Sequence, residues 1–228
     1  MKSELEFSSE LWEGFSDIKI FGPRSITEND ARAIIFLANR FNRNPQFLEV
    51  GCWHGHSTRF WAYSVSKLGG LLNCVDHWQG SLGTTYDEGT PFVRFEENLK
   101  QARLWNFLKI FRMSSEEASL LFEDESLDLV FLDGDHLYES FIRDFESWLP
   151  KVKKGGILCG HDAAPFYSEL SSQSRGTVDA LIHLEYFWLE EVGVHPGVVK
   201  ALYDLTNDKY NLFPQSNVWW LEKPYGSR

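Results

Sequence analysis

The stretch that decides the fold is Gln46-Phe-Leu-Glu-Val-Gly-Cys-Trp-His-Gly-His56. Residues 47–50 are mostly apolar and have the character of a strand buried inside a parallel sheet. Gly51 and Gly55 then allow the backbone to turn tightly and to approach a ligand closely. Because apolar side chains recur at helical spacing over residues 57–66, the segment predicts a strand, a glycine-containing turn and a helix. That arrangement can hold a nucleotide-like ligand.

A dinucleotide site is the first alternative for this turn, but its fingerprint requires Gly-x-Gly-x-x-Gly. Here Trp53 occupies the place of the middle glycine, and Glu49 lies just before the turn. A carboxylate at that point would repel a pyrophosphate and would suit a cationic ligand with a free amino group. A strand, turn and helix with chance glycines would also give this pattern, so the rest of the chain must decide.

The composition indicates a folded, acidic protein. The chain has 228 residues, of which 43% are hydrophobic and 15% aromatic, enough for one well-buried domain or two very small ones. Its formal net charge is -11, from 33 acidic and 22 basic residues. This balance offers no basic stripe for a phosphate backbone, so we expect no nucleic-acid partner and favour a small neutral or cationic substrate.

The sequence also bears on where in the cell the protein is expected. It begins without the organisation of a signal peptide, and no apolar run approaches the roughly 20 residues of a membrane span. We therefore expect a cytoplasmic protein that has no membrane partner, and a homo-oligomer remains open. Cys52, Cys74 and Cys159 are widely spaced and odd in number, so we expect reduced, buried thiols and neither disulfides nor a zinc site.

Helix and strand signals alternate along the chain. They predict an α/β fold, namely a doubly wound, Rossmann-like sheet of seven strands, mostly parallel with an antiparallel last strand, and helices on both faces. The expected strands follow Pro45 and span residues 71–75, 107–111, 127–132, 157–159, 210–213 and 218–221. The expected helices span residues 27–41, 57–66, 92–104, 116–122, 141–149, 178–190 and 198–207. Thr27 and Asp30 have the pattern of a capping box at the first of these helices.

Polar residues follow several of these strands, at the edge where parallel sheets bind ligands. They are Glu49 and Gly51, then Asp76, Asp133, and the pair His161 and Asp162. Any one of them could be a helix cap or a solvated charge, but four strands that end alike indicate a site. Asp76 is placed to accept both ribose hydroxyls of a nucleoside, with a simple turn residue as the alternative. Trp78 could stack on a purine or pack in the core.

Two further segments are the most specific in the chain, Leu127-Asp-Leu-Val-Phe-Leu-Asp-Gly-Asp-His-Leu-Tyr-Glu-Ser140 and Trp148-Leu-Pro-Lys-Val-Lys-Lys-Gly-Gly-Ile-Leu-Cys-Gly-His-Asp162. With the glycine turn, they resemble class I S-adenosylmethionine (SAM) methyltransferases. The resemblance is to the catechol O-methyltransferase-like group, in particular bacterial small-molecule and sugar O-methyltransferases. It implies SAM as cofactor and transfer of a methyl group to a hydroxyl of a small-molecule acceptor.

The resemblance implies a cofactor site by position. Its residues would be Glu49, Gly51, Trp53, Gly55, Ser57, Asp76, His77, Trp78, Ser114, Ser115 and Asp133. The two serines follow the third strand, where this group places a polar loop against adenine. For Ser114 a helix N-cap is the alternative.

The same resemblance implies a magnesium site and a base. By position the metal ligands would be Asp133, His161 and Asp162. Because magnesium prefers carboxylates, His161 favours a more nitrogen-tolerant divalent metal, or none. A divalent cation would stabilise the acceptor oxygen as it loses its proton. His136, three residues after Asp133, is the candidate catalytic base, with a capping or surface role as its alternative.

The resemblance also divides the chain. Residues 1–44 would be an N-terminal helical segment, and residues 45–228 the SAM-binding domain. Residues 163–194 form an aromatic insertion, which would be a lid over the acceptor pocket or an aromatic helix packed on the sheet or on a second subunit. Two other functions stay open, a small-molecule hydroxylase on the same fold and a non-catalytic binding protein with a vestigial SAM pocket.

Overall fold

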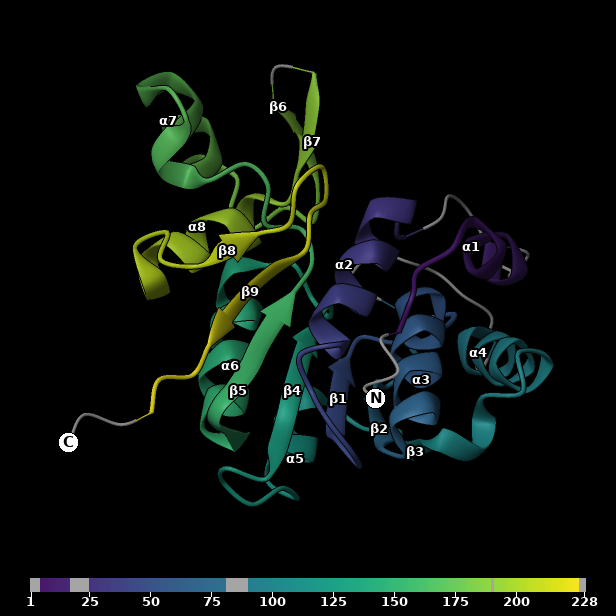
Figure 1. The fold of residues 1–228 in the computed structure, drawn as a ribbon. Helices are drawn as coiled ribbons and strands as arrows, with labels where there is room; N and C mark the ends of the chain where they lie inside the picture. The colour runs from purple at the N-terminus through teal and green to yellow at the C-terminus, as the bar shows by residue number, and fades with distance from the viewer. Residues whose placement is uncertain (1–4, 17–24, 81–89, 190, 226–228) are drawn as a thin grey trace. The chain divides into compact units, whose positions relative to one another are not determined.

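The computed structural model describes residues 5–16, 25–80, 90–189 and 191–225. Seven strands form one sheet in the order β3-β2-β1-β4-β5-β9-β8, and β6 and β7 form a separate two-stranded sheet (Figure 1). β9 pairs in antiparallel fashion with β5 and β8. The predicted fold class is therefore confirmed. In the described part of the chain, no helix is both long enough and apolar enough to span a bilayer.

The chain comprises two compact units, residues 1–118 and residues 119–228. The division predicted between residues 44 and 45 stays a prediction.

The first unit contains three parallel strands with helices around them. The strands are β1 (Gln46–Val50), β2 (Leu71–Val75) and β3 (Leu108–Phe111). The helices are α1 (Ser9–Ser16), α2 (Glu28–Ala38), α3 (His56–Leu68), α4 (Thr90–Gln101) and the short α5 (Ser115–Ser119), with a 3-10 turn at Trp105–Phe107. Glu49 lies beside Cys74 in the β1–β2 register, so the carboxyl ends of these two strands meet at one edge.

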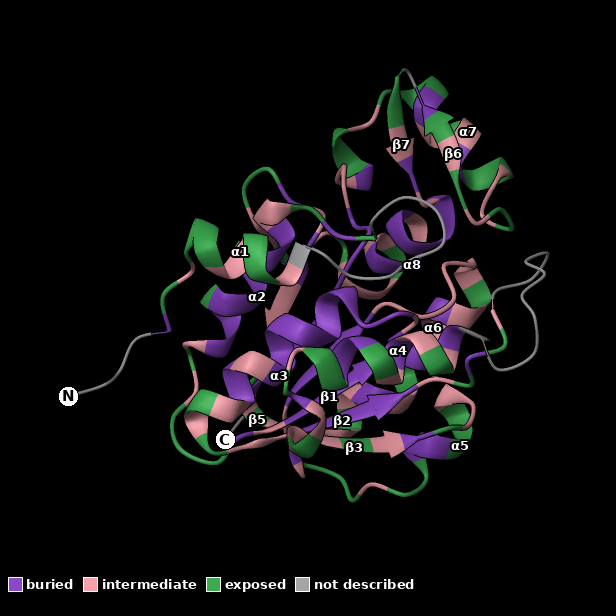
Figure 2. Cartoon of the chain, turned by 90° about the vertical axis from the view of Figure 1, so that its right-hand side faces the viewer, coloured by how far each residue is buried: buried purple, intermediate pink, exposed green. Residues whose placement is uncertain are grey.

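Local sequence signals explain where the helices of this unit begin and end. The predicted capping box opens α2, because the Thr27 side chain accepts from the Asp30 N–H while the Asp30 carboxylate accepts from the Thr27 N–H at 2.7 Å. Gly69 ends α3 in the left-handed region, with φ 74. β1, β2 and α3 are largely buried (Figure 2), and their buried residues combine apolar side chains such as Leu48 and Phe60 with polar ones such as Glu49 and Arg59.

The second unit contains the other strands of the large sheet. They are β4 (Leu127–Leu132), β5 (Val152–Gly160), β8 (Asn211–Leu212) and β9 (Trp219–Glu222). Its helices are α6 (Tyr138–Trp148), α7 (Ser172–Ala180) and α8 (Pro196–Thr206), with 3-10 turns at Leu149–Lys151 and Tyr167–Glu169. β4 and β5 are parallel, and Leu132 lies beside Gly160. The residues that follow both strands therefore emerge together.

The helix predicted over residues 178–190 is wrong. α7 ends at Ala180, and the segment continues as the hairpin of β6 (Phe187–Leu189) and β7 (Val192–Val194). Aromatic and β-branched residues favour strands, and the alternating environment of Phe187, Trp188 and Leu189 is that of a strand with one exposed face. The sequence also predicts a polar, glycine-rich loop over residues 77–91, and residues 81–89 of it lie outside the described part of the chain.

Candidate functional site

The turn after β1 has an unusual backbone. Gly51, Trp53 and Gly55 all have positive φ, at 82, 41 and 86. A Cβ on Gly55 would lie 2.4 Å from Leu99 Cδ2, so both conformation and space favour glycine there. A non-glycine residue such as Trp53 in this region is uncommon, and such strain concentrates at ligand-binding positions.

Asp76 holds this turn from the end of β2. Its Oδ2 accepts the backbone N–H groups of Cys52 at 2.9 Å and Trp53 at 2.8 Å, and its Oδ1 accepts the N–H of Trp78 at 2.6 Å. A carboxylate has about four acceptor positions, so roughly one remains for a ligand hydroxyl. The predicted contact with both ribose hydroxyls stays a prediction.

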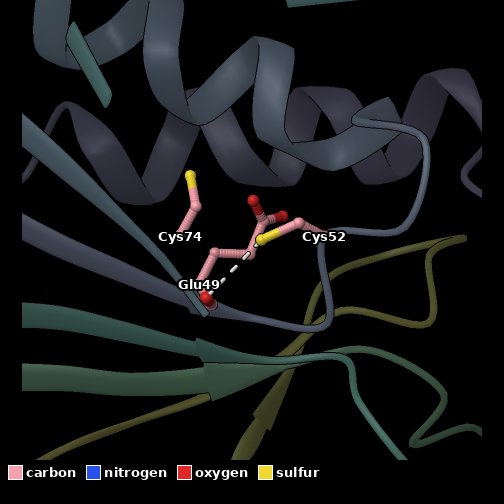
Figure 3. Close-up of side chains that lie close together, drawn as sticks. All are labelled: Glu49, Cys52 and Cys74. Atoms are coloured by element: carbon pink, nitrogen blue, oxygen red, sulfur yellow. Dashed lines mark hydrogen bonds between the residues drawn. The ribbon is translucent and has the colours of Figure 1, made fainter. Parts of the chain in front are cut away.

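Glu49 is fully buried at the end of β1. Its Oε1 accepts a hydrogen bond from Ser57 Oγ at 2.5 Å, which connects β1 to the first turn of α3. Figure 3 shows the thiols of Cys52 and Cys74 beside this carboxylate, with Cys52 Sγ donating to the Glu49 backbone oxygen at 3.7 Å. Burial raises the pKa of both thiols. These two thiols and that of Cys159 are buried and not disulfide-bonded, as predicted. The expected absence of a zinc site stays a prediction, since Glu49, Cys52 and Cys74 offer ligand atoms within 4.8 Å of one another.

Trp78 belongs to the core of the first unit. It is 2% exposed, and the rings of Phe92 and Phe95 lie at centroid distances of 4.9 and 5.0 Å. Its Nε1 donates to the Trp53 carbonyl at 2.8 Å. Trp78 therefore packs in the core, which was the alternative to stacking on a purine. Its hydrogen bond to Trp53 also holds the turn after β1. Its neighbour His77 is exposed on the same segment.

Ser114 caps α5. Its Oγ accepts the N–H of Glu117 at 3.3 Å and donates to the Glu117 carboxylate at 2.8 Å. Ser114 thus has the role of a helix N-cap, which was the alternative to an adenine contact. Ser115 is the first residue of α5, and an adenine contact from either serine stays a prediction.

His54 was missed by the sequence analysis. It is buried, and its ring stacks on Trp53 at a centroid distance of 4.0 Å. Burial, with the nearby Arg94 charge, lowers the pKa of His54 to about 4. The turn therefore contains a neutral imidazole at physiological pH.

In the second unit, the residues after β4 and β5 meet in a cluster of imidazole and carboxylate groups. His161 Nδ1 lies 2.9 Å from Asp162 Oδ1 and 3.9 Å from Asp133 Oδ1. His161 and Asp162 are 6% and 8% exposed. The structure therefore brings together the three residues that the resemblance implied as metal ligands.

The candidate base His136 lies in the same cluster. Its Nε2 is 3.0 Å from Asp162 Oδ2 and 3.7 Å from Asp133 Oδ1. Its Nδ1 is 2.7 Å from Glu185 Oε2. Glu185 comes from the predicted insertion, and the insertion is fixed beside His136 because the Tyr138 N–H donates to the Ile182 carbonyl at 3.1 Å.

His195 completes the cluster from the start of α8. Its Nε2 lies 3.5 Å from Asp162 Oδ1, and its ring centroid is 4.4 Å from that of His136. Gly197 permits this approach, since a Cβ there would lie 2.3 Å from the His136 carbonyl oxygen and 2.4 Å from the Tyr138 nitrogen. The sequence analysis missed Glu185 and His195. A histidine directly before Pro196-Gly197 was the available signal for the second.

The histidines and carboxylates of this cluster shift one another's pKa values. Burial would lower the pKa of His136, but its hydrogen bonds with Asp133, Asp162 and Glu185 outweigh burial and raise this pKa well above 6.5. Burial likewise opposes ionisation of Asp162, yet His161 and His136 hold its pKa well below 3.8. Burial lowers the pKa of His195. Positive charge bound by the same carboxylates would lower the pKa of His136 again.

The residues of this cluster form two possible sets of metal ligands, one of Asp133, His161 and Asp162 and the other of His136, Asp162 and His195. Within each set the ligand atoms lie within 4.8 Å of one another. Magnesium takes oxygen ligands in near-ideal octahedral geometry, whereas the first set includes one imidazole and the second includes two. The cluster therefore fits a nitrogen-tolerant divalent cation better than the magnesium of the resemblance.

Comparison with known proteins identifies the class. Residues 48–163, just over half of the chain, match the methyltransferase domain family. The chain therefore belongs to this family, and the predicted resemblance to class I SAM-dependent methyltransferases is confirmed.

The chain is also similar to a relative in sequence and to several solved structures. The chain is 30% identical over 123 residues to the uncharacterized protein y4gI of Sinorhizobium fredii, a match that covers 53% of this chain and 13% of that protein. The chain thus spans only a small part of that relative's length.

Three structures share the fold. A protein from Corynebacterium glutamicum has a TM-score of 0.67 at 13% identity and covers 100% of this chain and 95% of its own. An SAH-bound methyltransferase from Podospora anserina has 0.64 at 15%, covering 97% and 91%. An O-methyltransferase family protein from Burkholderia thailandensis has 0.55 at 13%, covering 87% and 59%.

Proposed function

We propose that this chain is a SAM-dependent methyltransferase that transfers a methyl group to a hydroxyl of a small molecule. The observation that carries the proposal is the turn after β1, which has three residues with positive φ and whose Cys52 and Trp53 N–H groups donate to the Asp76 carboxylate. The glycines of this turn would permit close approach of a nucleoside, and the turn lacks the pyrophosphate-binding Gly-x-Gly-x-x-Gly. Membership of the methyltransferase domain family supports the same cofactor.

The second unit supplies groups suited to the acceptor. In methyl transfer to oxygen, the new C–O bond forms as the C–S bond of the sulfonium breaks, SAH leaves, and the hydroxyl proton passes to a base. His136 is the candidate base, because its Nδ1 is held by Glu185 and its Nε2 faces the cluster. A neighbouring acid that fixes the ring and its tautomer is the usual support for such a base. A divalent cation, when bound by Asp133 and Asp162, would stabilise the oxygen as it becomes negative.

Calorimetry with SAM and SAH, followed by an acceptor screen, tests the proposal. We expect both compounds to bind, and we expect incubation with SAM and small hydroxyl compounds to yield SAH and a methylated product, detected by mass spectrometry. A hydroxylated product would support the alternative enzyme on this fold. Absence of heat with both SAM and SAH would favour a non-catalytic binding protein.

A further inference from the structure

We propose that the polar cluster of the second unit binds a first-row transition-metal ion in preference to magnesium, and that His195 is one of its ligands. The inference deepens the proposed function, on which it rests for the role of the ion. Whether the metal binds can be measured without any methyl transfer.

Asp162 is the group on which the cluster converges. Its Oδ1 lies 2.9 Å from His161 Nδ1 and 3.5 Å from His195 Nε2. Ligand atoms bound about 2.1 Å from one metal ion lie roughly 3.0 to 3.4 Å from their neighbours in octahedral or tetrahedral geometry. Each nitrogen thus lies at about the distance from Asp162 that separates two ligands sharing an ion, and His195 forms one set with Asp162 and His136 whose ligand atoms all lie within 4.8 Å of one another. Asp133 Oδ1, 3.9 Å from His161 Nδ1, adds a second carboxylate.

The donor types decide which ion fits. The set of His136, Asp162 and His195 offers two imidazole nitrogens and one carboxylate oxygen. Imidazole is a good ligand for zinc, iron, cobalt and nickel, and divalent affinities rise from manganese towards copper. Magnesium dehydrates reluctantly and favours oxygen ligands. A site with two imidazoles therefore selects against magnesium.

The His195 ring lies 4.4 Å from the ring of His136 and 5.3 Å from that of Tyr186, by centroids, and forms no capping hydrogen bond in the described part of the chain. His195 precedes α8 at the N-cap position, and its Nδ1 is buried without a hydrogen-bond partner among the described residues. Its position is nevertheless enforced, because α8 can approach His136 only with glycine at residue 197. Binding of a metal ion would explain why the chain has a close backbone contact at residue 197 that brings the His195 imidazole to Asp162.

Glu185 separates the role of His136 from that of the metal ligands. It contacts His136 Nδ1 at 2.7 Å, leaving Nε2 as the nitrogen that faces Asp162. Carboxylates that hold the second nitrogen of a histidine are common around metal sites and catalytic bases alike. His136 can therefore act as the base beside an ion that Asp162 and His195 bind.

The test titrates the whole chain, first treated with a chelator, with cobalt(II). We expect binding of one cobalt ion per chain, with visible absorption bands that report nitrogen ligands, and no displacement by a thousandfold excess of magnesium. Displacement of cobalt by magnesium at comparable concentration would overturn the proposal, as would the absence of any cobalt binding. This measurement on the unaltered chain needs no variant to fold.

His195→Gln tests the assignment of the ligand. We expect at least a tenfold loss of cobalt affinity and a changed absorption spectrum. His183→Gln is the matched control, because His183 is an exposed histidine of the same 163–194 segment, and it should bind cobalt as the unaltered chain does. Equal cobalt affinity and spectrum in His195→Gln and His183→Gln would remove His195 from the site.

SAH calorimetry on the same samples separates this inference from the proposed function. Cobalt binding that depends on His195, without SAH binding, would uphold the metal site and contradict the methyltransferase. SAH binding without cobalt binding would do the reverse.

Discussion

Both units present polar groups at the ends of parallel strands, but they hold these groups in different ways. In the first unit the Asp76 carboxylate is satisfied by three backbone N–H groups of its own and the neighbouring turn. In the second unit Asp133 and Asp162 contact the side chains of histidines. Backbone donors fix a shape, whereas imidazoles can exchange a proton or bind a cation. The arrangement around Asp76 suits the binding of one invariant cofactor. The arrangement around Asp162 suits proton transfer or the binding of a cation.

Replacement of Asp76 should have the largest effect of the substitutions that test this comparison, and the effect should be on SAH affinity. Asp76→Ala leaves the N–H groups of Cys52 and Trp53 in the turn, and that of Trp78, without their acceptor, and hydrogen bonds to charged groups contribute about 1.5–3 kcal/mol each. We expect a loss of SAH affinity of at least about a hundredfold, with a smaller loss for Asp76→Asn, measured by calorimetry. The exposed Asp124→Asn serves as control. Unchanged affinity in Asp76→Ala would show that the turn does not depend on this carboxylate.

Gly197→Ala should disrupt the second unit alone. The new Cβ would meet backbone atoms at 2.3 and 2.4 Å, and overpacking typically costs about 1–3 kcal/mol of unfolding free energy. Denaturant unfolding should show this loss, and cobalt binding should weaken. Gly176→Ala is the matched helical control, since nothing lies within 4 Å of a Cβ there, and it should stabilise the chain by about 0.5–1 kcal/mol. Equal stability of both variants would contradict the close approach of α8.

Acid should weaken the first unit through His54. Its pKa is about 4 in the folded chain against 6.5 ordinarily, so the unfolded chain binds more protons between these values and stability falls as pH decreases from 6.5 to 4. The slope has an upper limit of about 1.36 kcal/mol per pH unit. Unfolding of the unaltered chain and of His54→Gln across this range should show a shallower pH dependence in the variant. Parallel curves would exclude His54 as the source.

Ser114→Ala should have the smallest effect. Loss of the N-cap of α5 costs about 0.5–1 kcal/mol, which thermal unfolding would detect. The predicted adenine contact adds a second readout, because a serine that binds the cofactor should also lower SAH affinity. A change in stability with full SAH affinity would leave Ser114 as a cap only.

The strands that shape both sites could be predicted from the sequence because they are short apolar runs bounded by clear turn signals. β2 and β4 begin and end at the predicted residues. The capping box of α2 and the buried thiols follow from equally local patterns. The hairpin of β6 and β7 was missed because its aromatic residues also fit a helix, and local spacing could not separate the two.

The contacts within the sites were harder to predict. Asp133, His161 and Asp162 were found because they follow strands, and parallel pairing of β4 and β5 brings such residues together. Glu185 lies between α7 and β6, and His195 follows β7 of the hairpin that was not predicted, so their approach to His136 depends on tertiary packing. The burial of Trp78 depends on Phe92 and Phe95 of α4, which no local pattern connects to it.

Calorimetric titration of chelator-treated chain with SAH tests most directly whether the first unit binds the cofactor through its backbone turn. We expect one SAH per chain, an affinity unaffected by removal of metal or by Asp162→Asn, and loss of binding in Asp76→Ala. A chain that gives no heat with SAH, or that binds SAH only when metal is restored, would contradict the separation of cofactor binding from the imidazole and carboxylate cluster.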